Sequence, residues 1–261
     1  IGGIDKNIKK LNLFKKKYKV FGFLKIKDAL KNLDPDIFVI STNTSTHLKI
    51  IKEIFSNKVQ NKILLCEKPC GNSLKEIEQI KKICKKNNSK IFVNYMRSSM
   101  HGINELIEFC KKDNNYFRGI TYYNKSILNE ASHYINLFQK VFGKIIKVKN
   151  EFYKSNNKKI NNFTLFFKNG NIKFISLNNT IYHNSRFEIF LKSGYINYNS
   201  DHDFLKFFNT TNNKIYDNII LNQKSAKKIK LNFKNTQMQI VNQLINKNNP
   251  KNPGLVSIDE A

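Results

Sequence analysis

The chain has 261 residues, of which 40% are hydrophobic and 12% aromatic, enough for one large core or two modest domains, which argues against global disorder. The formal net charge is +27, yet only three residues are arginine and the lysines are spread evenly. Because specific readers of nucleic acid favour the bidentate guanidinium, this charge does not indicate a specific nucleic-acid partner.

The sequence also bears on location. No apolar run reaches the roughly 20 residues of a membrane-spanning helix, so we expect no membrane segment. The four cysteines form no C-x-x-C pair, which favours buried, reduced thiols and a cytoplasmic protein. The alternative is a disulfide between Cys66 and Cys70, which the strand-to-helix corner between them disfavours.

Residues 1–95 alternate between strands and helices. The apolar runs predict strands at 1–5, 18–21, 36–41, 62–66 and 90–94, and amphipathic patterns predict helices at 6–17, 26–33, 47–55 and 73–86. The last helix opens with the capping box Ser73…Glu76. Strands that are apolar throughout and separated by helices are typical of a parallel sheet covered on both faces.

The pattern changes to β-rich after a helix over 98–112. Strands are predicted at 116–125, 145–153, 161–168, 171–177, 187–191 and 195–198, with helices at 129–142 and 236–245. Asn169-Gly170 is a strong hairpin signal, and Gly143 ends the first of these helices. The Asn/Lys-rich tracts 154–162 and 210–218 are expected to be solvated loops. This half predicts an α+β domain with a mostly antiparallel sheet.

Asp5 ends the first strand, where dinucleotide-binding folds place the acidic residue that contacts the adenosine ribose. The alternative is an ordinary N-cap of the next helix. No G-x-G-x-x-G occurs in the chain, so we expect the first strand and glycine turn to precede residue 1. The box Ser257…Glu260 similarly indicates a helix that continues past residue 261. Both ends are therefore expected to be truncated.

Four segments carry a resemblance to one family. They are "DIFVISTNTSTH" at 36–47, "CEKP" at 66–69, "VNYMR" at 93–97 and "NEASHYINLFQKVFG" at 129–143. Together they resemble the Gfo/Idh/MocA family of glucose–fructose oxidoreductase and inositol 2-dehydrogenase. The resemblance implies α/β plus α+β: residues 1–97 as a Rossmann-type dinucleotide-binding domain lacking its first strand and Gly-rich turn, and residues 98–261 as a substrate and oligomerisation domain with an open sheet.

The resemblance further implies a nicotinamide cofactor, NAD or NADP, held by Asp5, Thr42, Asn43, His47, Glu67, Lys68 and Pro69. Thr42 and Asn43 would run along its ribose and phosphate, and Glu67 would contact the nicotinamide ribose. Pro69 would follow a cis peptide. For Thr42 and Asn43 the alternative is a strand-end turn, and for His47 a structural role in capping. Asp5 favours NAD, because a carboxylate repels the 2′-phosphate of NADP.

The resemblance assigns catalysis to Lys68 and His133, and substrate binding to Tyr95, Arg97, Asn129 and His133. A histidine near neutrality can take the substrate hydroxyl proton, and an ammonium can stabilise the developing alkoxide. For Arg97 the alternative is a surface arginine. Asn129 and Asn136 depart from the family, which commonly has aspartate at both positions.

These expectations add up to an NAD(P)-dependent oxidoreductase that moves a hydride between the nicotinamide and a hydroxyl or keto carbon of a sugar, sugar derivative or nucleotide sugar. A non-catalytic dinucleotide- or sugar-binding regulator of the same fold is the alternative, which the two asparagines favour. The expected partners are a sugar-like small molecule and further copies of the chain, bound through the C-terminal sheet. No metal, specific nucleic acid or membrane is expected, and the 261-residue polypeptide should bind cofactor weakly.

Overall fold

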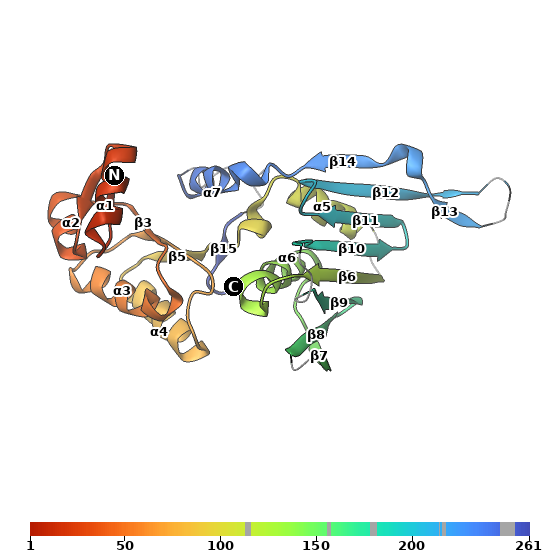
Figure 1. Cartoon of the computed structure of the whole chain (residues 1–261), viewed down its shortest axis with the longest axis horizontal. Coiled ribbons are helices and arrows are strands. Elements are labelled where there is room, and N and C mark those ends of the chain that lie inside the picture. Colours follow the sequence, from red (N-terminus) through yellow and green to blue (C-terminus); the bar gives the residue numbers. More distant parts are fainter. Residues whose placement is uncertain (113–115, 156–157, 178–181, 214, 216–217, 246–253) are drawn as a thin grey trace. The chain divides into compact units, whose positions relative to one another are not determined.

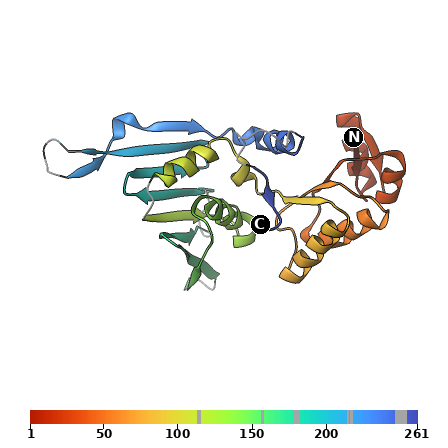
Figure 2. The ribbon, with the colours of Figure 1, turned by 180° about the vertical axis from the view of Figure 1, so that it is seen from behind.

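The chain folds into two compact units, one of residues 1–95 and 255–261 and the other of residues 96–254 (Figures 1 and 2). The computed structural model describes residues 1–112, 116–155, 158–177, 182–213, 215, 218–245 and 254–261. The sequence predicted that every residue from 98 onward belongs to the second domain. The last seven residues instead pack with the first unit.

The first unit contains two parallel β-sheets. Its strands are β1 (Gly2–Ile4), β2 (Phe21–Phe23), β3 (Ile37–Ile40), β4 (Ile63–Cys66), β5 (Lys90–Val93) and β15 (Val256–Ser257), and its helices are α1 (Ile8–Tyr18), α2 (Ile26–Asn32), α3 (Thr44–Ser56) and α4 (Leu74–Lys86). β1 pairs with β2, and β3, β4 and β5 form a second parallel set. β15 adds antiparallel to β5, which is why the C-terminal segment belongs here.

No pairing joins β1 to β3, although every residue of both strands is described. Each strand therefore keeps one edge that is not hydrogen-bonded within a sheet. Apolar side chains are exposed on these strands, with Ile4 at 43% and Val39 at 61%. A fully buried parallel sheet has no such exposed positions.

The core of the second sheet explains its local structure. β4 is buried along its whole length, with Leu64 and Cys66 at 0% exposure. Ile51 of α3 and Ile80 of α4 are also fully buried and belong to the same cluster as Leu64. α4 begins as its capping box predicts, since Ser73 Oγ accepts the Glu76 N–H at 3.3 Å. The covered strands thus present their carboxyl ends at one edge of the sheet.

The second unit is built on one nine-stranded sheet. Its strands are β6 (Phe117–Tyr123), β7 (Lys147–Ser155), β8 (Lys158–Phe167), β9 (Gly170–Ser176), β10 (Arg186–Leu191), β11 (Gly194–Asn199), β12 (Phe204–Asn212), β13 (Ile219–Leu221) and β14 (Lys227–Lys230). The order is β13-β12-β11-β10-β6-β9-β8-β7, with β14 also on β12. All pairs are antiparallel except β6 with β9, which confirms the predicted α/β plus α+β class. Gly170 is required at its turn, because a Cβ there would lie 2.2 Å from the Phe117 carbonyl oxygen.

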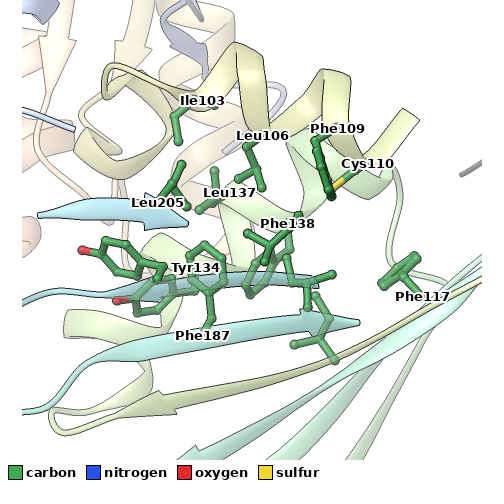
Figure 3. Close-up of a cluster of buried hydrophobic side chains, with 14 of the residues drawn as sticks. Ile103, Leu106, Phe109, Cys110, Phe117, Tyr134, Leu137, Phe138, Phe187 and Leu205 are labelled. Atoms are coloured by element: carbon green, nitrogen blue, oxygen red, sulfur yellow. The ribbon is translucent and has the colours of Figure 1, made fainter. Parts of the chain in front are cut away.

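Two helices cover one face of this sheet. α5 (Ile103–Lys111) and α6 (Ser132–Phe142) contribute Leu106, Leu137 and Phe138, which are at most 1% exposed. Figure 3 shows them in one cluster with Phe187 and Leu205 of the sheet. The Phe138 ring meets the Phe187 ring edge-on, with centroids 5.3 Å apart. Since α6 carries the predicted base His133, this aromatic packing fixes the helix on which that residue lies.

Three strands of the second unit were missed by the sequence patterns, namely β12, β13 and β14. The expectation of a loop at 210–218 is wrong in part, because β12 extends to Asn212 and pairs with β13 through 210–212. The expectation of a loop at 154–162 is also wrong where the chain is described, because β7 and β8 pair along residues 147–155 and 158–166. In both tracts the backbone hydrogen bonds between strands form although the side chains are mostly Asn and Lys. The unit also contains short 3-10 turns at Met96–Ser99, Gln223–Ser225 and Phe233–Asn235, and helix α7 (Thr236–Ile245), as predicted.

Candidate functional site

The carboxyl ends of three parallel strands gather the predicted cofactor residues. Thr42 and Asn43 follow β3, the segment 67–69 follows β4, and Asn94 follows β5. Strands in parallel register end at the same edge, and the register here pairs Ile40 with Cys66 and Cys66 with Val93. In open α/β sheets this edge is where ligands bind.

Glu67 is held in place by its two neighbouring strands. Its backbone N–H donates to the Ile40 carbonyl at 2.9 Å, and its carboxylate Oε1 accepts a hydrogen bond from Asn94 Nδ2. Asn94 is itself 4% exposed. Its other amide atom, Oδ1, is buried without a hydrogen-bond partner among the described residues. A buried acceptor without a donor is costly, so this edge has an acceptor available to a ligand N–H or O–H.

Lys68 and Pro69 complete the segment after β4. Both are half-buried, and the peptide bond between them is cis, as the resemblance implied. The apolar strand therefore turns sharply as soon as it leaves the sheet and leads into α4 through Gly71 and Asn72. Glu76 Oε2 accepts the Asn72 N–H at 2.8 Å, which anchors the end of this turn.

Thr42 and Asn43 lead into α3 and are both exposed. Asn43 is the N-cap of α3, but its side chain makes no capping hydrogen bond. Thr46 instead donates its hydroxyl to the Asn43 carbonyl at 2.7 Å. The Thr42 hydroxyl lies 2.8 Å from the Thr46 hydroxyl. The Asn43 side chain is thus left to the solvent at a helix N-terminus, where backbone N–H groups favour anionic ligands.

His47 is fully buried and is not the helix cap. Its Nε2 lies 3.0 Å from the Thr42 carbonyl oxygen, and its Nδ1 lies 3.2 Å from the Cys70 carbonyl oxygen. The imidazole therefore ties the turn after β3 to the turn after β4. This geometry gives His47 a positioning role and places its ring away from the solvent side of the edge.

Asp5 is exposed at the end of β1. Its Oδ1 accepts the Asn7 N–H at 2.8 Å, and Asn7, not Asp5, caps α1 by accepting the Lys10 N–H. The alternative that Asp5 is the N-cap of α1 is therefore wrong. The carboxylate closes a short turn and faces solvent.

Helix α6 and its leading turn carry the residues predicted for substrate and proton transfer. Residues Ile127–Ala131 form one π-helical turn that leads directly into α6, so the helix predicted from 129 begins slightly earlier. Asn129 is exposed on this turn, and its backbone N–H donates to Ser126 Oγ at 3.2 Å. His133 is half-buried in the first turn of α6. Gly143 ends the helix with a φ of 86°, as predicted.

Arg97 is buried at 9% exposure, so the alternative of a surface arginine is wrong. It donates from Nη1 to the Tyr198 hydroxyl at 2.7 Å, and its guanidinium carbon lies 4.5 Å from the centre of the Tyr134 ring. Burial opposes its charge, but Tyr134, Tyr198 and Glu130 more than offset burial and raise the pKa of Arg97. The guanidinium thus stays charged inside an aromatic surround.

Asn136 and Tyr95 are also placed by packing. Asn136 Oδ1 accepts the Ser98 hydroxyl at 2.6 Å in a buried position, so this asparagine links α6 to the 3-10 turn at Met96–Ser99. Tyr95 belongs to the first unit and is half-buried. Burial raises the pKa of its phenol, so Tyr95 is neutral at physiological pH.

Glu130 is a functional candidate that the sequence reasoning missed. It is 4% exposed, its Oε2 accepts the N–H groups of Asn124 and Lys125 at 2.7 and 2.9 Å, and its Oε1 lies 2.9 Å from His183 Nε2. Burial by itself would raise its pKa, but these hydrogen bonds and His183 prevail and lower it. The Ser185 hydroxyl is hydrogen-bonded to the Tyr134 hydroxyl, and it also helps to lower the pKa of Glu130. The only sequence signal was that Glu130 is the single acidic residue of the predicted helix 129–142.

The structure therefore gathers the predicted residues into two sets. The first set lies at one edge of the first unit and consists of Thr42, Asn43, His47, Glu67, Lys68 and Pro69. Tyr95 lies just beyond β5, and Asp5 lies on the separate β1–β2 sheet. Arg97, Asn129 and His133 lie in the second unit. No cluster of three or more metal-ligating side chains occurs among the described residues. In the same part of the chain, no helix has the length and apolar character to cross a membrane.

The first set fits one half of a dinucleotide. Its Glu67 carboxylate and the unsatisfied Asn94 Oδ1 suit the hydroxyl and amide groups of a nicotinamide riboside. The exposed turn at Thr42 and Asn43 suits the polar backbone of the cofactor. A glycine-rich cradle for the pyrophosphate is not found in the sequence.

Comparison with known proteins identifies the class. Residues 1–95 match the model of the GFO_IDH_MocA family, described as an oxidoreductase family with an NAD-binding Rossmann fold. The match covers residues 1–95 of the first unit, and over these residues it agrees with the family predicted from the sequence. A search of curated proteins found no match.

Solved structures share the fold over most of the chain. A dehydrogenase (MviM) from Clostridium difficile aligns with a TM-score of 0.73 at 16% identity, over 100% of this chain and 85% of its own. UDP-N-acetylglucosamine 3-dehydrogenase GnnA from Acidithiobacillus ferrooxidans aligns with a TM-score of 0.73 at 12% identity, over 99% and 84%. The WlbA dehydrogenase from Bordetella pertussis, solved with NADH and UDP-GlcNAcA, aligns with a TM-score of 0.62 at 14% identity, over 77% and 66%. At these identities the likeness shows the fold alone, and it extends through the second unit.

Proposed function

We propose that this protein is an NAD(P)-dependent oxidoreductase that transfers a hydride between the nicotinamide and a hydroxyl or keto carbon of a sugar, sugar derivative or nucleotide sugar. The observation that carries the proposal is the segment Glu67-Lys68-Pro69. It leaves a buried parallel strand at the carboxyl edge of the sheet, next to an Asn94 amide that still has an acceptor to offer. The match of residues 1–95 to an NAD-binding family supports it.

The proposed roles of the residues follow from their chemistry. The nicotinamide, when bound, accepts or gives the hydride. Glu67 and Asn94 hold its ribose, and Thr42 and Asn43 lie along the polar part of the cofactor. Lys68 orients the substrate oxygen and stabilises negative charge that develops on it. His133 takes the hydroxyl proton during oxidation and returns it during reduction.

The substrate class rests on weaker support. The fold neighbours include a UDP-N-acetylglucosamine dehydrogenase and a dehydrogenase solved with UDP-GlcNAcA. Asn129 is exposed next to the helix that carries His133, and an amide can hydrogen-bond a sugar hydroxyl without taking its proton. NAD is favoured over NADP because the Asp5 carboxylate is exposed at the end of β1, although Asn7 N–H occupies one of its oxygens. We also propose a cytoplasmic location.

A homo-oligomer through the outer face of the C-terminal sheet is part of the proposal. The face away from α5 and α6 carries a row of aromatic side chains across three strands. The rings of Phe190 and Tyr195 lie 5.1 Å apart, and those of Tyr195 and Phe208 lie 5.5 Å apart. Phe190 is 44% exposed, and exposed aromatic clusters of this kind favour association. Sedimentation of Phe190→Asp as a smaller species than the wild type would support this, whereas a monomeric wild type would exclude it.

The alternative is a dinucleotide-binding regulator without catalysis. Asn129 and Asn136 favour it, because neither can act as a base. The position of Asn136 weakens that argument, since its side chain is engaged by Ser98 in the core of the unit. The two functions differ in one property: a regulator binds the cofactor without turning it over.

The test separates binding from chemistry. The full-length protein, Lys68→Ala and His133→Ala are assayed for NAD(H) binding and for reduction or oxidation of the nicotinamide with a panel of sugars and nucleotide sugars. Lys75→Ala, on the exposed first turn of α4, and His202→Ala, in an exposed turn, serve as matched controls. The enzyme predicts turnover that both site variants abolish and both controls keep. Cofactor binding without turnover across the panel would establish the regulator instead.

A further inference from the structure

A small cavity in the second unit is lined by residues that have no role in the proposed reaction. Its volume is about 140 Å³, and it lies between α5 on one side and β12 and β14 on the other. The apolar floor consists of Phe109 of α5 (Figure 3), Phe207 of β12 and Ile229 of β14, which are at most 9% exposed. The Phe109 and Phe207 rings are tilted against each other, with centroids 5.1 Å apart. The floor is therefore the aromatic edge of the core of this unit.

Charged side chains surround the open side of the cavity. Glu105 and Glu108 lie on the α5 wall, Lys227 lies on the β14 wall, and Lys112 comes directly after α5. Glu108, Lys112 and Lys227 are exposed, so the cavity opens to solvent. Lys227 stands opposite Phe207 in the register of β12 with β14. Since opposite residues share one face of a sheet, its side chain leaves the sheet next to the aromatic floor.

These four charged groups are not paired with one another. Glu108 and Lys112 have the spacing at which a glutamate and a lysine usually attract each other, and the backbone is still helical at Lys112. Even so, none of the four forms an ion pair within the part of the chain that the structure describes. Glu105 and Glu108 are neighbours on one helix face, where two negative charges repel. The cavity thus presents two carboxylates and two ammonium groups whose charges are not matched.

We propose that this cavity binds a free α-amino acid whose side chain is apolar and about the size of a ring, such as phenylalanine. An apolar cavity of about 150 Å³ accepts a benzene ring, so the volume here suits the side chain. A third ring can pack edge-on against the tilted pair in the floor. The ammonium group of the ligand lies between Glu105 and Glu108, and its carboxylate faces Lys112 and Lys227.

The arrangement of charge decides the class of ligand. An amine without a carboxylate would leave both lysines unmatched, and a carboxylate without an ammonium group would be repelled by the two glutamates. An α-amino acid carries both charges on one carbon atom, which suits two walls that face each other across a small space. An amino acid with a short side chain would leave the floor uncovered. The inference goes beyond the proposed oxidoreductase function and does not depend on it.

A ligand-observed NMR titration of the full-length protein tests the site without any activity measurement. We expect L-phenylalanine to bind with a Kd of about 1 mM or below, as suits a ligand of this size in a partly open cavity. The comparison ligands are 2-phenylethylamine, 3-phenylpropionate and L-alanine, which lack the carboxylate, the ammonium group and the ring, respectively. Each should bind at least about tenfold more weakly, because one of the three recognised groups is missing.

Substitutions locate the binding. Glu108→Gln and Lys227→Met should each weaken the binding of phenylalanine by about 3–10-fold, since each removes one charged contact at the mouth of the cavity. Lys228→Met is a matched control, because the next residue along a strand points to the opposite face of the sheet. Glu53→Gln, on α3 of the first unit, is the control for the loss of a carboxylate. All four side chains are exposed, so the variants should fold as the wild type does.

Three outcomes would overturn the proposal. In the first, phenylalanine does not bind at concentrations well above the expected Kd. In the second, 2-phenylethylamine or 3-phenylpropionate binds as tightly as phenylalanine, so that one charge is sufficient. In the third, the two control variants lose as much affinity as Glu108→Gln and Lys227→Met, which would place the ligand elsewhere. None of these measurements uses a nicotinamide or a sugar, so their result is separate from that of the oxidoreductase test.

Discussion

The replacement Glu130→Gln removes a buried negative charge while it keeps the size of the side chain. The carboxylate receives two backbone N–H groups on one oxygen, at 2.7 and 2.9 Å, and lies 2.9 Å from His183 on the other. A hydrogen bond to a charged group contributes about 1.5–3 kcal/mol, against about 0.5–1.5 kcal/mol for a neutral one. In Glu130→Gln both backbone hydrogen bonds become neutral and the His183 contact is weakened. The free energy of unfolding should therefore fall by about 2–3 kcal/mol.

Thermal unfolding measures this loss. For a unit of the size of residues 96–254, each kcal/mol lowers Tm by about 2–4 °C, so Glu130→Gln should lower Tm by about 4–12 °C at pH 7. Glu108→Gln, on the exposed side of α5, is the matched control and should leave Tm nearly unchanged.

The stabilisation that Glu130 provides should depend on pH. The pKa of Glu130 is lower in the folded protein than its ordinary value, because the backbone hydrogen bonds outweigh burial. Its stabilising contribution is therefore present above the ordinary carboxyl pKa of about 4.3 and is lost as pH falls through the depressed folded value. The difference in Tm between wild type and Glu130→Gln should shrink below about pH 4. A difference that stays constant down to acid pH, or one absent at pH 7, would refute the reasoning.

Three further predictions concern the core, the cofactor edge and the whole chain. Phe138→Ala should destabilise the second unit by about 3–5 kcal/mol in denaturant unfolding, since a fully buried ring is removed, while Val148→Ala, exposed at 51%, should cost less than about 0.5 kcal/mol. Asn94→Ala should raise the KM for NAD(H) more than it lowers kcat, because Asn94 holds Glu67; a normal KM would count against the edge as the cofactor site. A polypeptide of residues 1–261 should show little rise in Tm with added NAD, because no G-x-G-x-x-G occurs in it and no pairing joins β1 to β3; a clear, saturable rise would contradict this.

Local patterns predicted the first unit well because each signal there is short-range. A continuous apolar run predicted β4, and a capping box predicted the start of α4 at Ser73. The segment after β4 could be assigned because three residues in a row carry the motif. What local patterns could not give was the Glu67–Asn94 bond, since it joins residues 27 apart and depends on the register of β4 with β5.

The second unit shows the limits more clearly. β12 runs into the polar tract at 210–212, which was expected to be a loop, because cross-strand pairing with β13 stabilises it there and not its own composition. Arg97 was expected either in a binding site or on the surface, and only packing against Tyr134 and Tyr198 shows that it is buried. Glu130 was overlooked for the same reason, because its partners Asn124 and His183 come from different loops.

The most direct test of the account follows the transfer of a deuterium label to the nicotinamide, in addition to the rate of turnover. A sugar-type substrate found by the panel is prepared with deuterium at the carbon to be oxidised, and the full-length protein is incubated with it and NAD. The account predicts that deuterium appears on the reduced nicotinamide, and that Lys68→Ala and His133→Ala abolish the transfer. Cofactor that binds but never gains deuterium from any member of the panel would contradict it.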